Sequence, residues 1–124
     1  MIKEIAFTAY PAKDVAGLRK WYEEKLGLKF SFPYEEDGVE KYNEANVGNS
    51  GGYFSVLWDG WADRAPGSAS GVVFEVADID DTIKDLRAKG VEVEDAYATP
   101  VCKITSFTDL EGNKVSLHQR TAPY

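Results

Sequence analysis

Two segments of the chain, residues 4–30 and 71–93, share one pattern of apolar and polar positions. Each begins with alternating residues, as in Gly-Val-Val-Phe-Glu-Val at 71–76, which is typical of a strand with one buried face. Each then changes to the spacing of an amphipathic helix. We therefore expect Val72, Phe74 and Val76 to face a helix, and Gly71, Val73 and Glu75 to share the opposite face.

Both helices have clear start and stop signals. Asp14 is suited to cap the first helix, and Gly27 supplies the left-handed residue that commonly ends one. Asp78 and Gly90 take the same places in the second helix. The apolar stripes predicted to face the sheets are Val15, Leu18, Tyr22 and Leu26 in the first helix, and Ile79, Ile83 and Leu86 in the second.

Three strands are expected after each helix. The turn at 35–38 separates the first pair in the first half, residues 49–52 separate the second pair, and residues 109–113 form the last hairpin. The predicted strands are 28–34, 39–47 and 52–58, followed by 91–97, 101–108 and 114–119. The sequence thus predicts an α+β fold in which two βαβββ modules form a curved mixed sheet around a cleft. Residues 1–124 would form a single domain, with module one at about 1–58, a linker at about 59–70 and module two at about 71–120.

The sheet face opposite the helices has an unusual composition for a packed core. In the last strand Val115 and Leu117 alternate with Ser116 and His118, so the two polar residues share that face. Small, polar and aromatic residues there favour a cleft over a second buried layer.

The composition of the chain limits the kinds of partner and site that it can have. The 124 residues carry a formal charge of −7, which disfavours nucleic acid and anionic membranes. No apolar run approaches the length of a membrane span, and the first residues do not resemble a signal peptide. Cys102 is the only cysteine, so we expect a reducing cytoplasmic setting, and His118 is the only histidine, which excludes sites that need two.

The chain resembles the vicinal oxygen chelate superfamily, which includes glyoxalase I, extradiol dioxygenases and bleomycin-binding proteins. The resemblance lies in the order and spacing of IAFTAYPAKDVAGLRKWYEEKLGL, VVFEVADIDDTIKDLRAKGVEV and FTDLEGNKVSLHQ. The last segment is similar to the family's D-P-D-G-N hairpin, with Leu110 in the place of proline. The resemblance implies a small-molecule cleft and a homodimer, whose modules pair within or between chains.

The resemblance also places the family's four metal ligands. They fall on Phe7, Ser55, Gly71 and Ser116. Phenylalanine and glycine have no side-chain ligand atom, and a neutral serine is a poor ligand compared with a carboxylate. The chain is therefore similar to a branch without metal, in which Ala-Tyr-Pro, Thr-Pro-Val-Cys and His-x-Arg segments recur. We expect no metal and no other cofactor.

His118 and Cys102 are the candidate catalytic residues. Histidine titrates near neutral pH, so His118 is a candidate cleft hydrogen-bonding group or general base, or else a solvated residue near a strand end. Cys102 is a candidate nucleophile or a pocket-wall residue, although a free cysteine is more often a small buried apolar residue. The two lie on neighbouring strands, so a Cys102–His118 dyad is a further hypothesis.

Aromatic residues are expected around the first half of the cleft. Phe7, Tyr53 and Trp58, with Trp61 nearby, would suit a planar or cationic ligand, and Glu75, Asp59 and Asp63 would add negative potential. The alternative is that the tryptophans pack at a dimer interface, which we favour for Trp61. The candidate ligand-binding residues are Phe7, Tyr53, Ser55, Trp58, Gly71, Glu75, Ser116 and His118.

These observations favour a binding protein over an enzyme. The leading hypothesis is a metal-independent protein that sequesters an aromatic or cationic small molecule, as in antibiotic resistance. The alternatives are a glyoxalase-like lyase or isomerase that uses His118 or Cys102 in place of a metal, and a dimerisation module without a ligand.

Overall fold

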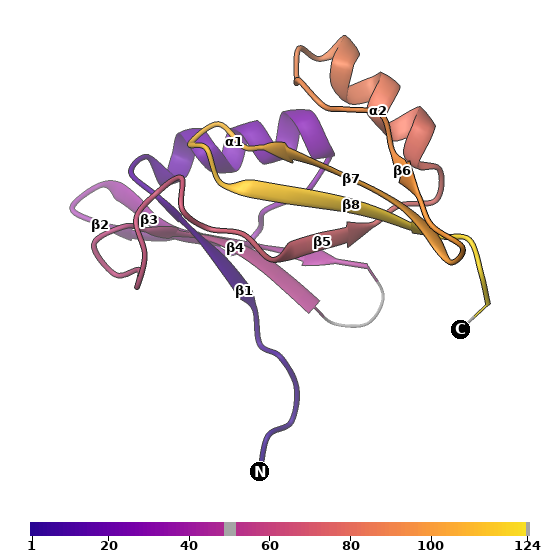
Figure 1. The fold of residues 1–124 in the computed structure, drawn as a ribbon. Coiled ribbons are helices and arrows are strands. Elements are labelled where there is room, and N and C mark those ends of the chain that lie inside the picture. Colours follow the sequence, from indigo (N-terminus) through magenta and orange to yellow (C-terminus); the bar gives the residue numbers. More distant parts are fainter. Residues whose placement is uncertain (49–51, 124) are drawn as a thin grey trace.

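Two four-stranded sheets, each with one helix, make up the structure, a computed structural model that describes residues 1–48 and 52–123. Both helices lie on the same side of the sheets (Figure 1). In chain order the elements are β1 (Thr8–Ala12), α1 (Val15–Leu26), β2 (Tyr34–Glu36), β3 (Val39–Val47), β4 (Gly52–Trp58), β5 (Val72–Glu75), α2 (Ile79–Ala88), β6 (Tyr97–Ala98), β7 (Cys102–Thr108) and β8 (Lys114–Arg120).

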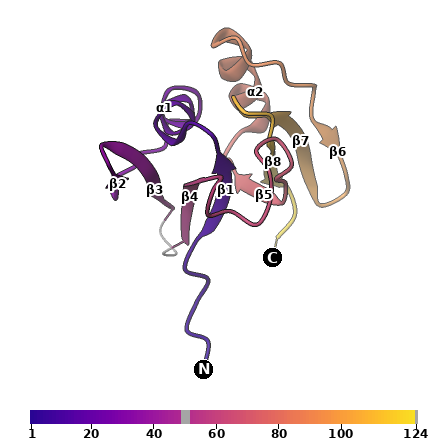
Figure 2. The same cartoon turned by 90° about the vertical axis from the view of Figure 1, so that its left-hand side faces the viewer.

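The two halves repeat one topology. Sheet A has the order β1-β4-β3-β2, and sheet B has the corresponding order β5-β8-β7-β6. In each sheet the first strand pairs in parallel with the last, and the remaining pairs are antiparallel. Figure 2 shows β1 and β5 near the middle of the molecule, with β2 and β6 at the outer edges. The predicted α+β fold with a repeated βαβββ order is confirmed.

The capping residues act as expected. Asp14 accepts a hydrogen bond from the Gly17 amide at 3.0 Å, and Asp78 accepts one from the Asp81 amide at 3.1 Å. Gly27 ends α1 with φ of 70°, in the left-handed region. The predicted stripes are buried except for Leu26, which is half-buried.

Two of the predicted strands are wrong over most of their length. In 28–34 a single bridge joins Phe30 to Ala45, and β2 begins at Tyr34. Pro33 has no amide hydrogen to donate, and the Phe32 amide is bound by the side chain of Asn43 at 3.0 Å. The backbone here is thus satisfied without a regular ladder.

The segment 91–97 departs from its predicted strand for a similar reason. The carbonyl of Val93 accepts hydrogen bonds from the Arg87 guanidinium, and the carbonyl of Glu94 accepts one from the Thr105 hydroxyl. Side chains therefore take the acceptors that a neighbouring strand would use, and β6 is confined to Tyr97–Ala98. The predicted turn at 49–52 lies largely outside the described residues.

One apolar core joins the two halves. Tyr10, Tyr22 and Phe54 from the first half belong to the same buried cluster as Phe107 and Leu117 from the second. No helix in the described residues is long and apolar enough to span a membrane.

The last hairpin ties the halves together with polar contacts. Tyr22 donates from its hydroxyl to the Asp109 carboxylate at 2.6 Å, and Glu111 accepts from the amides of Lys13 and Asp14. The side-chain amide of Asn113 accepts hydrogen bonds from the backbone amides of Gly67 and Ala69 and donates one to the Pro11 carbonyl. The hairpin of the second half thus fixes the first half against it.

Candidate functional site

Each sheet has a face that carries no helix, called here the helix-free face. In β4, Phe54 and Val56 pack in the core with α1, so Tyr53 and Ser55 lie on the helix-free face of sheet A. In β5 the same alternation leaves Val73 on the helix-free face of sheet B. These faces carry most of the predicted site residues.

On sheet A the aromatic side chains gather around one polar patch. The rings of Phe7 and Tyr42 meet edge to face with centroids 5.6 Å apart. Glu44 lies opposite Ser55 across the β3–β4 ladder. Burial raises the pKa of the Tyr42 phenol, Ser55 lowers it and Glu44 raises it, so Tyr42 is a neutral hydrogen-bonding group at neutral pH.

Two hollows on this side of the molecule meet at Tyr53. One, of about 370 Å³, is lined by Phe7, Phe32, Glu44 and Tyr53 among others. The other, of about 390 Å³, lies where the two halves join and is lined by Tyr53, Gly71 and neighbouring residues. Both volumes are within the range of small-ligand sites, about 300–1,000 Å³. Tyr53 therefore lies between the two hollows, with Phe7 in the lining of one and Gly71 in the lining of the other.

On sheet B, Glu75 and His118 form a close pair. The two residues lie side by side in the parallel β5–β8 ladder, and Nδ1 of His118 is 2.5 Å from Oε1 of Glu75. The other oxygen of Glu75 accepts from the Arg120 backbone amide at 2.8 Å. The amide of Arg120 and the His118 side chain together lower the pKa of the Glu75 carboxyl.

The remaining predicted residues of sheet B are paired locally. The hydroxyls of Ser116 and Ser106 are 3.0 Å apart across the β7–β8 ladder. Cys102 lies opposite Arg120, and its sulfur is 3.2 Å from the hydroxyl of Thr99, whereas His118 bonds to Glu75. The structure thus does not bring Cys102 and His118 together as a dyad.

Trp58 does not share a face with Tyr53. The two residues are five apart along β4, an odd spacing that turns their side chains to opposite sides of the sheet. Trp58 packs instead against the core with Trp61 at 5.5 Å between ring centroids, and Lys41 lies over its ring at 3.4 Å. The grouping of Trp58 with the cleft aromatics is therefore corrected.

The four positions at which the family would hold a metal do not fit one. The ring of Phe7 packs on Tyr42, Gly71 has no side chain, and Ser116 is bonded to Ser106. Ser55 is buried and offers only a neutral hydroxyl. Within the described residues, no three His, Cys, Asp or Glu side chains are grouped to hold a metal ion.

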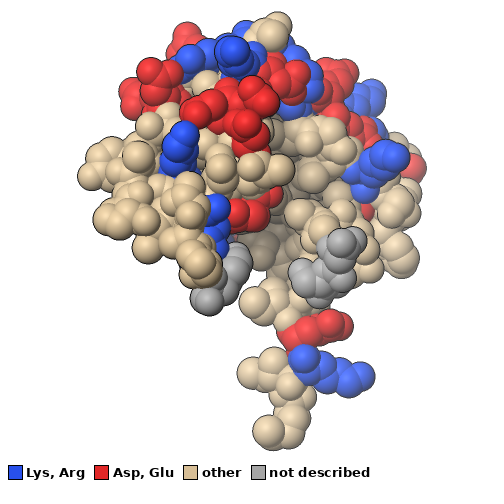
Figure 3. All heavy atoms as spheres, turned by 90° about the vertical axis from the view of Figure 1, so that its right-hand side faces the viewer, with Lys and Arg blue, Asp and Glu red and all other residues tan. Residues whose placement is uncertain are grey.

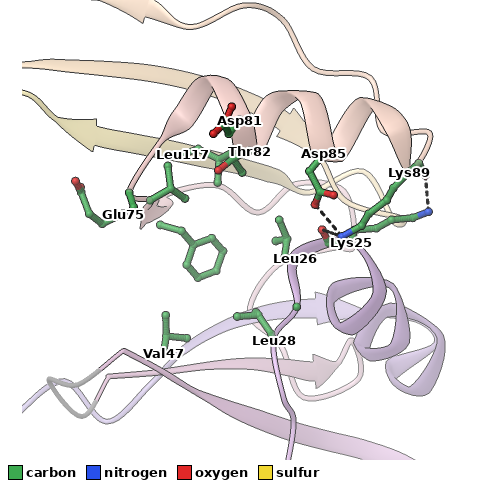
Figure 4. Close-up of a pocket in the computed structure, with 14 residues that line it drawn as sticks. Lys25, Leu26, Leu28, Val47, Glu75, Asp81, Thr82, Asp85, Lys89 and Leu117 are labelled. Atoms are coloured by element: carbon green, nitrogen blue, oxygen red, sulfur yellow. Dashed lines mark hydrogen bonds and ion pairs between the residues drawn. The ribbon is translucent and has the colours of Figure 1, made fainter.

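A third hollow lies on the helix side. This groove, of about 620 Å³, has an apolar lining that includes Leu26, Leu28 and Leu117, and the predicted site residue Glu75 also lines it (Figure 4). At one end Lys25 donates to the Lys89 carbonyl at 2.6 Å, which bridges the ends of the two helices. Figure 3 shows charged side chains gathered over the helices and a mainly uncharged surface around the recess below them.

Sequence reasoning missed three residues of these faces. Tyr42 and Glu44 lie on the helix-free face of sheet A, and the Arg120 amide holds Glu75. The alternating pattern of 39–47 could have placed Tyr42 and Glu44 on one face, because they are two residues apart in a strand. The contact of Arg120 depends on the β5–β8 register, which has no local signal.

The comparisons with known proteins cover nearly the whole chain. Residues 4–117 match the family model described as the Glyoxalase/Bleomycin resistance protein/Dioxygenase superfamily. No curated protein sequence matches the chain.

Solved structures share the fold over nearly the full length. The antibiotic-binding protein TnmS3 from Streptomyces sp. CB03234 is 21% identical, with 97% of this chain and 98% of that chain covered and a TM-score of 0.85. A superfamily member from Sphaerobacter thermophilus is also 21% identical, with 95% and 98% covered and a TM-score of 0.83. A lactoylglutathione lyase from Agrobacterium tumefaciens is 17% identical, with 96% and 95% covered and a TM-score of 0.73.

Proposed function

Because the chain belongs to the glyoxalase/bleomycin resistance protein/dioxygenase superfamily, we propose that it binds and sequesters a planar aromatic small molecule without a metal ion. The observation that carries the proposal is the hollow of about 370 Å³ that Phe7 and Tyr53 line beside sheet A, with Tyr42 packed on the Phe7 ring. Flat rings beside the polar side chain of Glu44, which lines the same hollow, suit a planar ligand. The likeness to the antibiotic-binding TnmS3 supports the same ligand class.

The donor set supports binding that is independent of metal. Divalent metals in proteins are held by imidazole, thiolate and carboxylate groups, and the four family positions offer none of these. Sequestration needs affinity alone, so it is compatible with this set of residues.

We propose that the protein acts as a homodimer of two-module chains, with modules at about 1–58 and 71–120 joined by the 59–70 linker. Ile5, Phe7 and Val73 are 78%, 47% and 53% exposed. A second copy would cover these apolar groups and complete the cleft. Light scattering should then give twice the mass of one chain, and Val73→Lys should yield the monomer.

The single cysteine supports a reducing, cytoplasmic setting.

Calorimetry on chelator-treated protein tests the proposal. Planar aromatic compounds, neutral and cationic, should bind, whereas polyols and aliphatic carboxylates should not. Tyr53→Ala should weaken binding about tenfold, because one aromatic contact contributes about 1 kcal/mol or more. Leu110→Ala, which removes an exposed apolar side chain from the distant hairpin, should leave binding unchanged.

Two results would contradict sequestration of this kind. Binding that appears only after a divalent metal is added would show that a metal is needed. An unchanged affinity in Tyr53→Ala would remove the aromatic face from the site. A thermal-shift screen without any stabilising compound would favour the ligand-free dimerisation module.

A second candidate function is a glyoxalase-like lyase or isomerase reaction. It is favoured by the Glu75–His118 pair, since a carboxylate bonded to Nδ1 is the arrangement that orients a histidine base. Turnover of a carbonyl compound that is lost in His118→Ala or Cys102→Ala would establish this alternative over binding alone.

A further inference from the structure

We infer that Glu75 is a positioning residue that fixes the proton of His118 on Nδ1, so that Nε2 is a hydrogen-bond acceptor for an O–H or N–H group of an aromatic ligand. This inference deepens the proposed function and rests on it for the ligand. It concerns the helix-free face of sheet B, where the pair lies.

For the neutral imidazole, the geometry leaves one arrangement for the proton. Glu75 approaches Nδ1 of His118 to 2.5 Å, and an ionised carboxylate can only accept hydrogen bonds. The carboxylate is held in place because its second oxygen accepts from the Arg120 amide at 2.8 Å. The nitrogen that faces Glu75 must therefore carry the hydrogen.

The second ring nitrogen is left available. Among residues 1–48 and 52–123, Nε2 of His118 makes no hydrogen bond, and the His118 side chain is 21% exposed. Ile104 lies opposite His118 in the β7–β8 ladder and offers no competing polar side chain. A neutral imidazole with hydrogen on Nδ1 then presents a lone pair at Nε2.

The second ring nitrogen sets the chemistry of the group that it can bind. Each oxygen of Glu75 accepts one hydrogen bond, one from His118 and one from the Arg120 amide, and these two bonds hold the carboxylate against the ring. In the neutral ring Nε2 has a lone pair and no hydrogen, so it binds a donor and not an acceptor. An aromatic molecule with a phenolic O–H or an N–H donor fits this nitrogen.

Nitrogen-detected NMR tests the proton position without a ligand. His118 is the only histidine, so its ring signals need no assignment by mutation. At pH 8 we expect the pattern of a ring protonated on Nδ1. Glu75→Met, which keeps the side-chain length and removes the acceptor, should shift the ring toward the form protonated on Nε2.

The controls separate this effect from a general loss of structure. Glu35→Met, on an exposed strand of sheet A, should leave the ring signals unchanged. Glu75→Ala should give the same shift as Glu75→Met, with circular dichroism as the check of folding. A wild-type ring protonated on Nε2, or a ring that does not respond to either Glu75 substitution, would overturn the inference.

A matched pair of probes tests the acceptor role. 2-Naphthol and 2-methoxynaphthalene have the same planar ring, but only the first has a hydrogen to donate. Wild-type protein should prefer 2-naphthol about tenfold, the effect of about one hydrogen bond, and Glu75→Met should lose the preference. Equal binding of both probes would overturn the acceptor role, whereas binding of neither would overturn the proposed aromatic ligand and leave the NMR result to decide the proton position.

Discussion

Replacing Asn113 by alanine should remove the polar joint between the two halves of the chain. Asn113 is fully buried, and its side-chain oxygen accepts from the amides of Gly67 and Ala69 at 2.8 and 3.2 Å. Its side-chain nitrogen donates to the Pro11 carbonyl at 3.2 Å and to the Asp109 carboxylate at 3.1 Å. One side chain thus binds the linker, the first strand and its own hairpin.

The magnitude follows from the groups left without partners. Gly67 is exposed, so water can bind its amide, but Ala69 and Pro11 are buried. An unsatisfied buried amide or carbonyl costs about 1–3 kcal/mol, so the two together cost roughly 2–6 kcal/mol. Because a domain of this size is stable by about 5–15 kcal/mol, we expect Asn113→Ala to lose a large fraction of the free energy of unfolding.

Urea unfolding followed by tryptophan fluorescence measures this loss. With a slope of about 2 kcal/mol per molar, a loss of about 4 kcal/mol lowers the midpoint by about 2 M at unchanged slope. Asn46→Ala is the matched control, because Asn46 is an exposed asparagine of β3, and it should change stability by less than about 0.5 kcal/mol. A loss below about 1 kcal/mol in Asn113→Ala, or an equal loss in both variants, would refute the reasoning.

Further predictions concern two other polar contacts. Tyr22→Phe should lower stability by about 1–2 kcal/mol in urea unfolding, because it removes the hydroxyl bonded to Asp109. Burial raises the pKa of the Tyr22 phenol above its ordinary value of 10. The stability that the neutral phenol contributes is therefore present below pH 10 and should be lost as the pH rises further. The loss of stability at alkaline pH should be smaller in Tyr22→Phe. Glu40→Gln should cost about 1–3 kcal/mol, because the Glu40 carboxylate binds the Arg19 guanidinium through both oxygens. Burial alone would raise the pKa of Glu40, but the hydrogen bonds from Arg19 and Asn43 lower it. The contribution of the Glu40 carboxylate to stability is therefore present above pH 4.5 and should be lost as the pH falls through the lowered pKa. An acid unfolding transition that is the same in wild type and Glu40→Gln would contradict this.

Local signals predicted the helices and the faces of the strands well. Asp14 and Asp78 were identifiable as caps because a carboxylate before an apolar stripe has a specific hydrogen bond to make. The separation of Ser116 and His118 from Val115 and Leu117 follows from the two-residue period of a strand. These features depend on residues close in sequence, so the sequence alone is sufficient for them.

The features that depend on distant residues could not be predicted. The backbone of 91–97 is bound by the side chains of Arg87 and Thr105, and nothing in the segment itself signals this. The pairing of Glu75 with His118 requires the β5–β8 register. Trp58 is a different case. Its odd spacing from Tyr53 along the strand already indicates that the two side chains lie on opposite sides of the sheet, but the prediction grouped them because both are aromatic.

The most direct test of the account is a crystal structure of chelator-treated protein with the tightest-binding aromatic compound from the calorimetric screen. We predict density for the compound on the helix-free faces, in contact with Tyr53 and with a donor directed to Nε2 of His118. A compound bound in the helix-side groove, or one held through a metal ion at Glu75 and His118, would contradict metal-independent binding at these faces.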